Sequence, residues 1–417
     1  MRTLLTGICV AIASTLFAQS KCASTDYLTE QKALDPTLAG KLAAAENFVR
    51  QMPTNARGTG ESFNIIRIPV VVHILYRTAA ENISDAQVKS QIDALNRDFR
   101  KKNGDTVNTP ERFKGLSADV FIEFYLATAD PYGRPTNGIV RKQTNVSDWR
   151  MDDAIKQASR GGDNAWDSRS YLNLWVGNML GLLGYSSSPG GPADKDGVVI
   201  NTTAFGTVNV NGPYNLGRTA VHEVGHWLGL KHIWGDTYCG DDGIDDTPKQ
   251  GNFTSGCPGG FRSSCSNGPL GDMYMNYMDF TDDACINLFT QGQKEHMLAL
   301  FRTGGPRNAL LSSRGLSEPW TSEAPIVETP IVTPTNTTAH FKFYPNPVAS
   351  ELVLDLSYNE AWVGKKLTIL NAGGTVLMQV TITAKTQSIS LAHLRPGLYF
   401  IQGDNGAEKL REKLVKL

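Results

Sequence analysis

Three histidines and one glutamate are crowded into "HEVGHWLGLKH", residues 222–232, in a chain that has seven histidines in all. If this stretch is helical, His222 and His226 lie one turn apart on the same face and can bind one metal ion. Gly229 tolerates left-handed backbone angles, so the helix can end there and the chain can bring His232 back as a third ligand. The spacing therefore predicts a site for a single metal ion.

Three neutral ligands leave the fourth position of a tetrahedral zinc ion for water, which is typical of a catalytic site. Zinc lowers the pKa of such a water to about 7. Glu223 follows the first ligand, and it can take the proton from the water and pass it to a leaving amine. We interpret the remaining histidines as packed or surface residues: His73, His296, His340 and His393.

The elements around this motif mix strands and helices. "IRIPVVVHILY", from Ile66, is a β-branched run typical of a buried strand. The next segment predicts an amphipathic helix, with Ser84 and Gln87 in a capping-box pattern. Further strands are expected in "VFIEFYLA", "SYLNLWVGNM" and "GVVINTTAF", with a long Gly/Pro/Ser loop, "GLLGYSSSPGGPADKDG", between the last two.

The 417 residues exceed what one core usually organises, and the net charge of −1 favours neither nucleic acid nor an acidic membrane as a partner. Arg2 and the apolar run after it predict a signal peptide, and no later stretch is long enough to span a membrane. The expected organisation is a signal peptide at 1–20, a removable pro-segment at 21–60, a catalytic domain at 61–315, a Pro/Thr-rich linker at 316–339 and a β-sandwich at 340–417.

Four of the six cysteines cluster: Cys239, Cys257, Cys265 and Cys285. In an exported protein we interpret them as two disulfides, of which sequence alone allows three pairings. Buried free thiols fit a cytosolic protein better, and a structural zinc site would usually contain C-x-x-C pairs, which are absent here.

These residues carry a family resemblance. "HEVGHWLGLKH" resembles the zinc signature of the metzincin metalloproteases, and "NYMDFTDDAC", residues 276–285, resembles the methionine turn of their pappalysin branch. The resemblance covers roughly residues 62–305. It implies that Met278 lies beneath the histidines and that the cysteines pair as Cys239–Cys265 and Cys257–Cys285. The family commonly has a tyrosine where this chain has Phe280, so we expect modest turnover.

The resemblance also implies a calcium site and a specificity pocket. In "CGDDGIDDTP" we expect Asp242, the Ile244 carbonyl and Thr247 to bind calcium, with Asp245 as a lesser candidate; a plain acidic loop is the alternative. The pappalysins have an aspartate at the position of Asp283, at the base of the pocket that receives the side chain after the cut. An unpaired buried carboxylate favours a cation, so cleavage before Arg or Lys is expected.

Cys22 stays unpaired if the other four cysteines pair among themselves. Its thiolate could occupy the open position on zinc until the pro-segment is removed, with Asp26 or no switch as alternatives. The segments "FKFYPNPVASELVLDL" and "LRPGLYFIQ" resemble the C-terminal sorting domain of type IX secretion. A carbohydrate-binding or adhesive sandwich is the competing interpretation.

Taken together, the sequence predicts an α+β metzincin-type catalytic domain, with a mixed twisted sheet and an active-site helix, followed by an all-β sandwich. We expect a secreted or surface-attached, monomeric zinc endopeptidase in which Glu223 activates a zinc-bound water. The alternatives are an inactive metal-binding adhesin and another zinc amidohydrolase. The expected partners are peptide substrates and the type IX secretion machinery, and the natural substrate and activating protease are not indicated.

Overall fold

The computed structural model describes residues 22–51, 64–321, 342–344, 346–355, 362–371, 375–384, 386–406 and 409–417. The predicted signal peptide, His340 and most of the predicted linker lie outside these ranges. The chain divides into two compact units, Met1–Pro325 and Ile326–Leu417. Within the described residues, no helix is long and apolar enough to cross a membrane.

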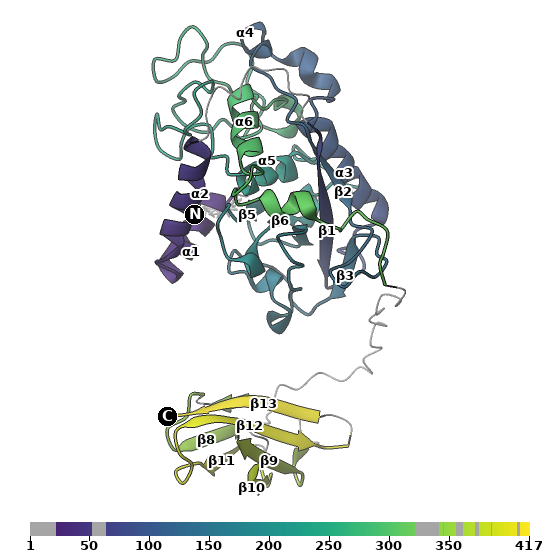
Figure 1. Ribbon diagram of the computed structural model, residues 1–417, viewed down its shortest axis with the longest axis vertical. Helices are drawn as coiled ribbons and strands as arrows, with labels where there is room; N and C mark the ends of the chain where they lie inside the picture. Colours follow the sequence, from purple (N-terminus) through teal and green to yellow (C-terminus); the bar gives the residue numbers. More distant parts are fainter. Residues whose placement is uncertain are drawn as a thin grey trace, which may run out of the picture. The chain divides into compact units, whose positions relative to one another are not determined.

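A six-stranded mixed sheet forms the centre of the first unit (Figure 1). β1 pairs in parallel with β2, β3 and β4, and β6 continues the parallel order after β4. β5 is antiparallel to β6 and forms one edge of the sheet. The strands are β1 Ile66–Tyr76, β2 Ile122–Leu126, β3 Ile139–Gln143, β4 Leu172–Gly177, β5 Gly184–Ser186 and β6 Val198–Asn201.

Edge strand β5 corrects the sequence analysis, which placed a long loop over this stretch. Its three residues are buried and pair with β6, so neighbouring strands rather than local β propensity make this segment extended. The short strand β3 was also missed, because its residues "IVRKQ" are largely polar.

Helix α3, Asp85–Phe99, lies against the sheet and begins as its sequence predicts. The Ser84 hydroxyl accepts a hydrogen bond from the Gln87 N–H. The expected capping box is only half formed, because the Gln87 side chain instead donates to the carbonyl of Phe205. The helix is thereby attached to the segment after β6.

Helix α5, Arg218–Trp227, is buried along its whole length between the sheet and the C-terminal part of the unit. Val221 and Val224 join the main hydrophobic core. The remaining helices of this unit after the pro-segment are α4 Glu111–Lys114 and α6 Gln291–Ala299, with 3₁₀ turns η2 Gly104–Asn108, η3 Ala154–Lys156, η4 Ala158–Arg160, η5 Ala193–Lys195, η6 Thr202–Ala204, η7 Asp283–Cys285 and η8 Asn308–Ser312.

The predicted pro-segment contains two helices, α1 Ser24–Leu34 and α2 Leu38–Arg50; α1 lies against β5, and α2 packs on α1 (Figure 1). Just before α1, the Ala23 N–H donates a 3.1 Å hydrogen bond to the Gly184 carbonyl on this strand. The start of the pro-segment is therefore attached to the exposed edge of the sheet.

The second unit contains a four-stranded sheet in the order β10-β9-β12-β13 and a three-stranded sheet in the order β11-β8-β7. Leu352 and Leu354 are buried, as their alternation predicts. The alternation predicts that Leu398 lies on the inward face of β12, but Leu398 is exposed and the buried residues are Tyr399 and Ile401. The inward face is therefore shifted by one residue. The strands are β7 Lys342–Tyr344, β8 Glu351–Asp355, β9 Lys366–Asn371, β10 Val376–Thr381, β11 Thr386–Ser390, β12 Gly397–Asp404 and β13 Lys409–Lys416.

Candidate active site

Helix α5 and the turn after it bring the three histidines of the sequence motif together. His222 and His226 lie one turn apart on α5, and Gly229, at φ 82°, reverses the chain after the helix. The Leu230 N–H then donates to the carbonyl of Gly225, which closes the turn. His232 follows from the loop, as the glycine signal predicts.

The three imidazoles face one point. The Nε2 atom of His226 lies 3.1 Å from the Nε2 atoms of both His222 and His232. Each Nδ1 atom is turned outward to an acceptor: the Tyr277 carbonyl for His222 (2.7 Å), the Leu230 carbonyl for His226 (2.8 Å) and the Asp236 carboxylate for His232 (2.5 Å).

This arrangement fits a metal ion. Because the Nδ1 atoms donate to their acceptors, the Nε2 atoms carry the lone pairs, and three converging lone pairs repel one another unless a cation lies between them. Burial, followed by the proximity of His232, lowers the pKa of His226 to about 3, so this ring is neutral and able to ligate. The donor set suits zinc, which binds imidazole nitrogen at about 2.0–2.1 Å.

Asp236 was missed by sequence reasoning, although its position four residues after His232 was a usable signal. Burial opposes ionisation of its carboxyl group, but the hydrogen bond to His232 together with the nearby imidazoles outweighs it, so the pKa of Asp236 is lowered. The carboxylate orients the His232 ring and makes its Nε2 a better ligand.

Met278 and Phe280 border the histidines from the segment before α6. Met278 is fully buried, and its sulfur packs so closely on α5 that a Cβ at Gly225 would lie only 2.5 Å from it. Phe280 packs edge-on against His232, with 4.9 Å between ring centroids. The methionine thus lies against the helix that carries two of the ligands.

Residues of the predicted pro-segment cover this site. Cys22 is buried, and its sulfur belongs with the histidine nitrogens to one group whose ligand atoms all lie within 4.8 Å of one another. Burial, and then the Glu223 carboxylate, raises the pKa of the Cys22 thiol well above its usual range, so a thiolate here needs a cation beside it. Asp26, the competing candidate, is exposed on α1.

Glu223 is fully buried and is also covered by the pro-segment. Its Oε2 accepts a 2.7 Å hydrogen bond from the hydroxyl of Ser24, and that hydroxyl accepts one from the Ser186 N–H on β5. Sequence reasoning missed Ser24 and Ser186, because no local pattern relates residues 162 positions apart.

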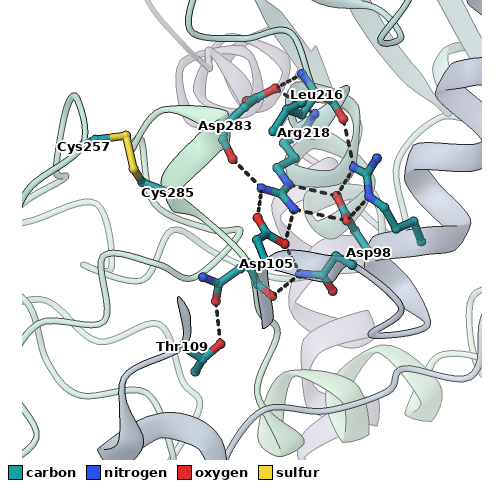
Figure 2. Close-up of polar contacts among 11 residues, drawn as sticks. Asp98, Asp105, Thr109, Leu216, Arg218, Cys257, Asp283 and Cys285 are labelled. Atoms are coloured by element: carbon teal, nitrogen blue, oxygen red, sulfur yellow. Dashed lines mark hydrogen bonds and ion pairs between the residues drawn. A yellow bond between two sulfur atoms is a disulfide. The ribbon is translucent and has the colours of Figure 1, made fainter. Parts of the chain in front are cut away.

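Asp283 is fully buried in a polar network next to the start of α5 (Figure 2). Its Oδ2 accepts hydrogen bonds from the N–H groups of Leu216 (2.9 Å) and Arg218 (3.2 Å). The Arg218 guanidinium contacts the Asp283 carbonyl and pairs with Asp98 and Asp105. Asp283 is therefore not an isolated carboxylate, because its Oδ2 serves as the acceptor for two backbone N–H groups near the N-terminus of α5.

The predicted calcium residues gather in one loop after His232. A cavity of about 240 Å³ is lined by Asp242, Ile244, Asp245 and Thr247. Thr247 lies 2.9 Å from the Asp242 carboxylate and 2.8 Å from the Ile244 carbonyl. Burial raises the pKa of Asp242 to about 7, so a cation in the cavity would favour its ionised form.

Two disulfides enclose the loops that follow the metal site. Cys239 is bonded to Cys265, and Cys257 is bonded to Cys285, next to Asp283. These are the pairs that the family resemblance implies.

The buried histidine triad, the adjacent glutamate and the mixed sheet together define a metallopeptidase of the metzincin type. A family model described as pregnancy-associated plasma protein-A matches residues 156–302, and one described as a secretion system C-terminal sorting domain matches residues 342–417. An extracellular metalloprotease from Pyricularia oryzae is 31% identical over 275 residues, which cover 62% of this chain and 83% of that protein.

Two solved structures are similar as well. A promirolysin variant from Tannerella forsythia is 44% identical, with a TM-score of 0.64, over 70% of this chain and 97% of that one. Mature mirolysin from the same organism, in complex with a cleaved peptide, is 49% identical, with a TM-score of 0.58, over 59% and 95% of the two chains.

The chain belongs to the pregnancy-associated plasma protein-A, or pappalysin, family of metallopeptidases. It is a secreted or surface-attached metalloendopeptidase with a type IX sorting domain at its C-terminal end.

Proposed function

We propose that this protein is a zinc-dependent endopeptidase, made as a latent precursor, that cleaves peptide bonds on the amino side of arginine or lysine. The observation that carries the proposal is the convergence of three Nε2 atoms directly beside a buried glutamate. That it acts as a monomer stays a prediction.

In this proposal, His222, His226 and His232 hold the zinc ion. A zinc ion bound there would lower the pKa of a water molecule and polarise the substrate carbonyl. Glu223 takes the proton of the attacking water and transfers it to the amine of the departing product. Asp236 and the carbonyls of Tyr277 and Leu230 keep the imidazole rings in the ligating orientation.

Specificity for a basic side chain is assigned to Asp283. Its carboxylate is buried a few residues after the methionine turn, and its Oδ2 accepts hydrogen bonds from the N–H groups of Leu216 and Arg218 (Figure 2). A buried carboxylate beside the cleavage site attracts a cation, and a substrate guanidinium or ammonium group supplies one. The role of Arg218 is to hold the Asp283 segment through its backbone carbonyl.

Latency is assigned to Cys22 and Ser24. The Cys22 sulfur lies among the histidine nitrogens, where it would take the coordination position that a water needs, and the Ser24 hydroxyl donates to Oε2 of Glu223, the proton-accepting group. Removal of α1 removes both inhibitory contacts at once, because Cys22 lies just before the first turn of this helix and Ser24 begins it. A calcium ion in the Asp242 cavity would stiffen the loop that follows His232.

The test is a cleavage profile of a proteome-derived peptide library by the activated enzyme beside its Glu223→Ala counterpart. We expect cuts before Arg or Lys that a zinc chelator and Glu223→Ala both abolish. Cuts that survive in Glu223→Ala contradict the role of this residue. Absence of any cut favours a metal-binding adhesin, and hydrolysis of non-peptide amides alone favours an amidohydrolase.

Specificity needs a separate variant. Asp283→Ala would also remove the acceptor of two N–H groups near α5, so Asp283→Asn is the better test, because its carbonyl oxygen can still accept them. We expect this variant to lose the preference for basic over neutral side chains by at least about tenfold. An unchanged preference would remove the assignment.

A further inference from the structure

The pro-segment places one aromatic side chain in a polar pocket of the catalytic unit, away from the metal. Tyr27 on α1 is 3% exposed, and its hydroxyl donates to Asp153 at 2.9 Å from Oδ1. The Lys156 ammonium group donates to the same hydroxyl at 3.2 Å. The phenol therefore meets an acceptor and a donor at the same time.

The polar floor of this pocket consists of Asp153, Lys156 and Lys195, which all belong to the predicted catalytic domain. Asp153 is 1% exposed and pairs with Lys156 at 3.1 Å and with Lys195 at 3.2 Å. The Lys156 ammonium also lies 5.6 Å from the ring centre of Trp175 and donates to the Lys195 carbonyl. Buried charges are costly unless they are held in good geometry; these pair with one another, and Lys195 also donates to Gln31 on α1 at 3.0 Å.

The pocket adjoins strand β5, whose outer edge the pro-segment occupies. The Gly184 carbonyl accepts from Ala23, and the Ser186 N–H donates to Ser24. When the pro-segment departs, these two groups are left without their partners on an edge strand, and an extended peptide can pair with them.

The geometry of a strand pair then places one substrate side chain at the pocket. Residues directly opposite each other on paired strands project to the same face. The ring of Tyr185, between Gly184 and Ser186, lies 4.8 Å from the ring of Tyr27. A peptide residue opposite Tyr185 therefore projects toward the space that Tyr27 fills in the precursor.

We propose that this pocket is a substrate subsite that selects tyrosine, with Asp153 and Lys156 as the specificity-determining residues. The inference rests on the proposed peptidase function and extends it to a second side chain of the substrate. A neutral hydroxyl suits a floor that carries both charges, since it donates to Asp153 and accepts from Lys156. Phenylalanine fills the same space but leaves both groups without that partner.

Charged side chains fit this pocket less well. A carboxylate would meet Lys156 but face Asp153, and a basic group would meet Asp153 but face Lys156. Burial, followed by the Asp153 charge, raises the pKa of Tyr27 far above its usual value, so the phenol binds in its neutral form.

The experiment compares peptides on the activated enzyme, released from the full-length precursor by cleavage within residues 52–63. Each peptide keeps arginine directly after the cut and carries tyrosine, phenylalanine or alanine at one other position in turn. We expect kcat/KM to be about tenfold higher for tyrosine than for phenylalanine at one position. Equal values within twofold at every position would overturn the inference.

The pocket is then tested with Asp153→Asn and its neighbour Asp152→Asn. Asp152 pairs with Arg160 at the surface, with a side chain 48% exposed, so it is the matched control. We expect Asp153→Asn to reduce the tyrosine preference to about twofold or less and Asp152→Asn to retain it. A tyrosine preference that survives in folded Asp153→Asn would place the subsite elsewhere.

The comparison on the unmodified enzyme needs no variant, so misfolding of Asp153→Asn cannot conceal the answer. The two possible negative results of this peptide comparison can also be told apart. If no peptide is cut, the proposed peptidase function is wrong, and the proposal of a subsite is wrong as well. If all peptides are cut before arginine at equal rates, the peptidase function stands and only the subsite is wrong.

Discussion

Phe280 lies at the border of the metal site, where its ring contacts those of His222, His232 and Trp234. A phenylalanine contributes packing here but no hydrogen bond, whereas the related peptidases that the sequence resembles commonly have a tyrosine. A hydroxyl at this place could donate to the oxygen that becomes negative in the transition state.

We therefore predict that Phe280→Tyr raises kcat by about tenfold with little change in KM, because the added bond forms mainly in the transition state. Steady-state kinetics on a peptide with arginine after the cut measures this change. Phe261→Tyr is the control, since its ring is 57% exposed near Arg112. An unchanged kcat would show that the hydroxyl has no role in this enzyme.

Gly225 is a second position where a single substitution is expected to have a measurable effect, in this case on stability. In a helix, alanine is ordinarily favoured over glycine by up to about 1 kcal/mol. Here an added Cβ would lie 2.5 Å from the Met278 sulfur, and overpacking a core costs about 1–3 kcal/mol. The steric cost exceeds the gain in propensity.

We predict that Gly225→Ala lowers the melting temperature of the precursor by about 2–6 °C. Thermal denaturation followed by circular dichroism is the measurement. The matched control is Gly115→Ala, because Gly115 has φ −70° and open space where the Cβ would be. An unaltered melting temperature for Gly225→Ala would mean that Met278 moves away without cost.

At the scale of elements, the first turn of α1 and the strand β5 form the latent arrangement. We predict that the unmodified precursor cleaves peptides only after a lag and that Cys22→Ala shortens this lag, because the metal site becomes accessible to water while Ser24 still contacts Glu223. The lag before product appears is the measurement.

Asp26→Ala is the control for this prediction, since Asp26 lies exposed on the same helix. It should retain the full lag. The opposite result, activation by Asp26→Ala and not by Cys22→Ala, would assign latency to the aspartate.

The loop after His232 carries the proposed calcium site and supports the third ligand. We predict that a calcium-selective chelator lowers the melting temperature by about 5–10 °C, because the ion binds only the folded loop. Asp242→Asn should lower it to a similar extent and make it insensitive to the chelator. Asp194→Asn, an exposed residue outside the cavity, should behave as the unmodified protein does. Chelator effects that persist in Asp242→Asn would locate calcium elsewhere.

At the scale of the whole molecule, the peptidase and the sorting domain are separate compact units. We predict that a chain ending at residue 321 keeps its melting temperature and, once activated, its kcat/KM, but stays inside the cell. Immunoblots of cell and medium fractions measure its location. Full-length Glu223→Ala is the control and should be exported normally. Export of the shortened chain would contradict the sorting role of residues 342–417.

Much of this architecture could be predicted because its signals are local. Three examples depend only on residues close in the sequence. They are the β-branched run of β1, the Ser84 cap of α3 and the four-residue spacing of the histidines on α5. Strand β5 and the inward face of β12 could not be predicted in this way. Pairing with neighbouring strands decides whether such a short segment is extended and which of its faces is buried.

The sequence by itself determined the metal triad, since helical periodicity and one glycine turn suffice to gather His222, His226 and His232. Only the tertiary structure decided what surrounds it: the Tyr277 carbonyl behind His222, Ser24 on Glu223 and Tyr27 between Asp153 and Lys156. These contacts join residues 55 to 199 positions apart. Their geometry depends on the path of the whole chain, which no short-range pattern encodes.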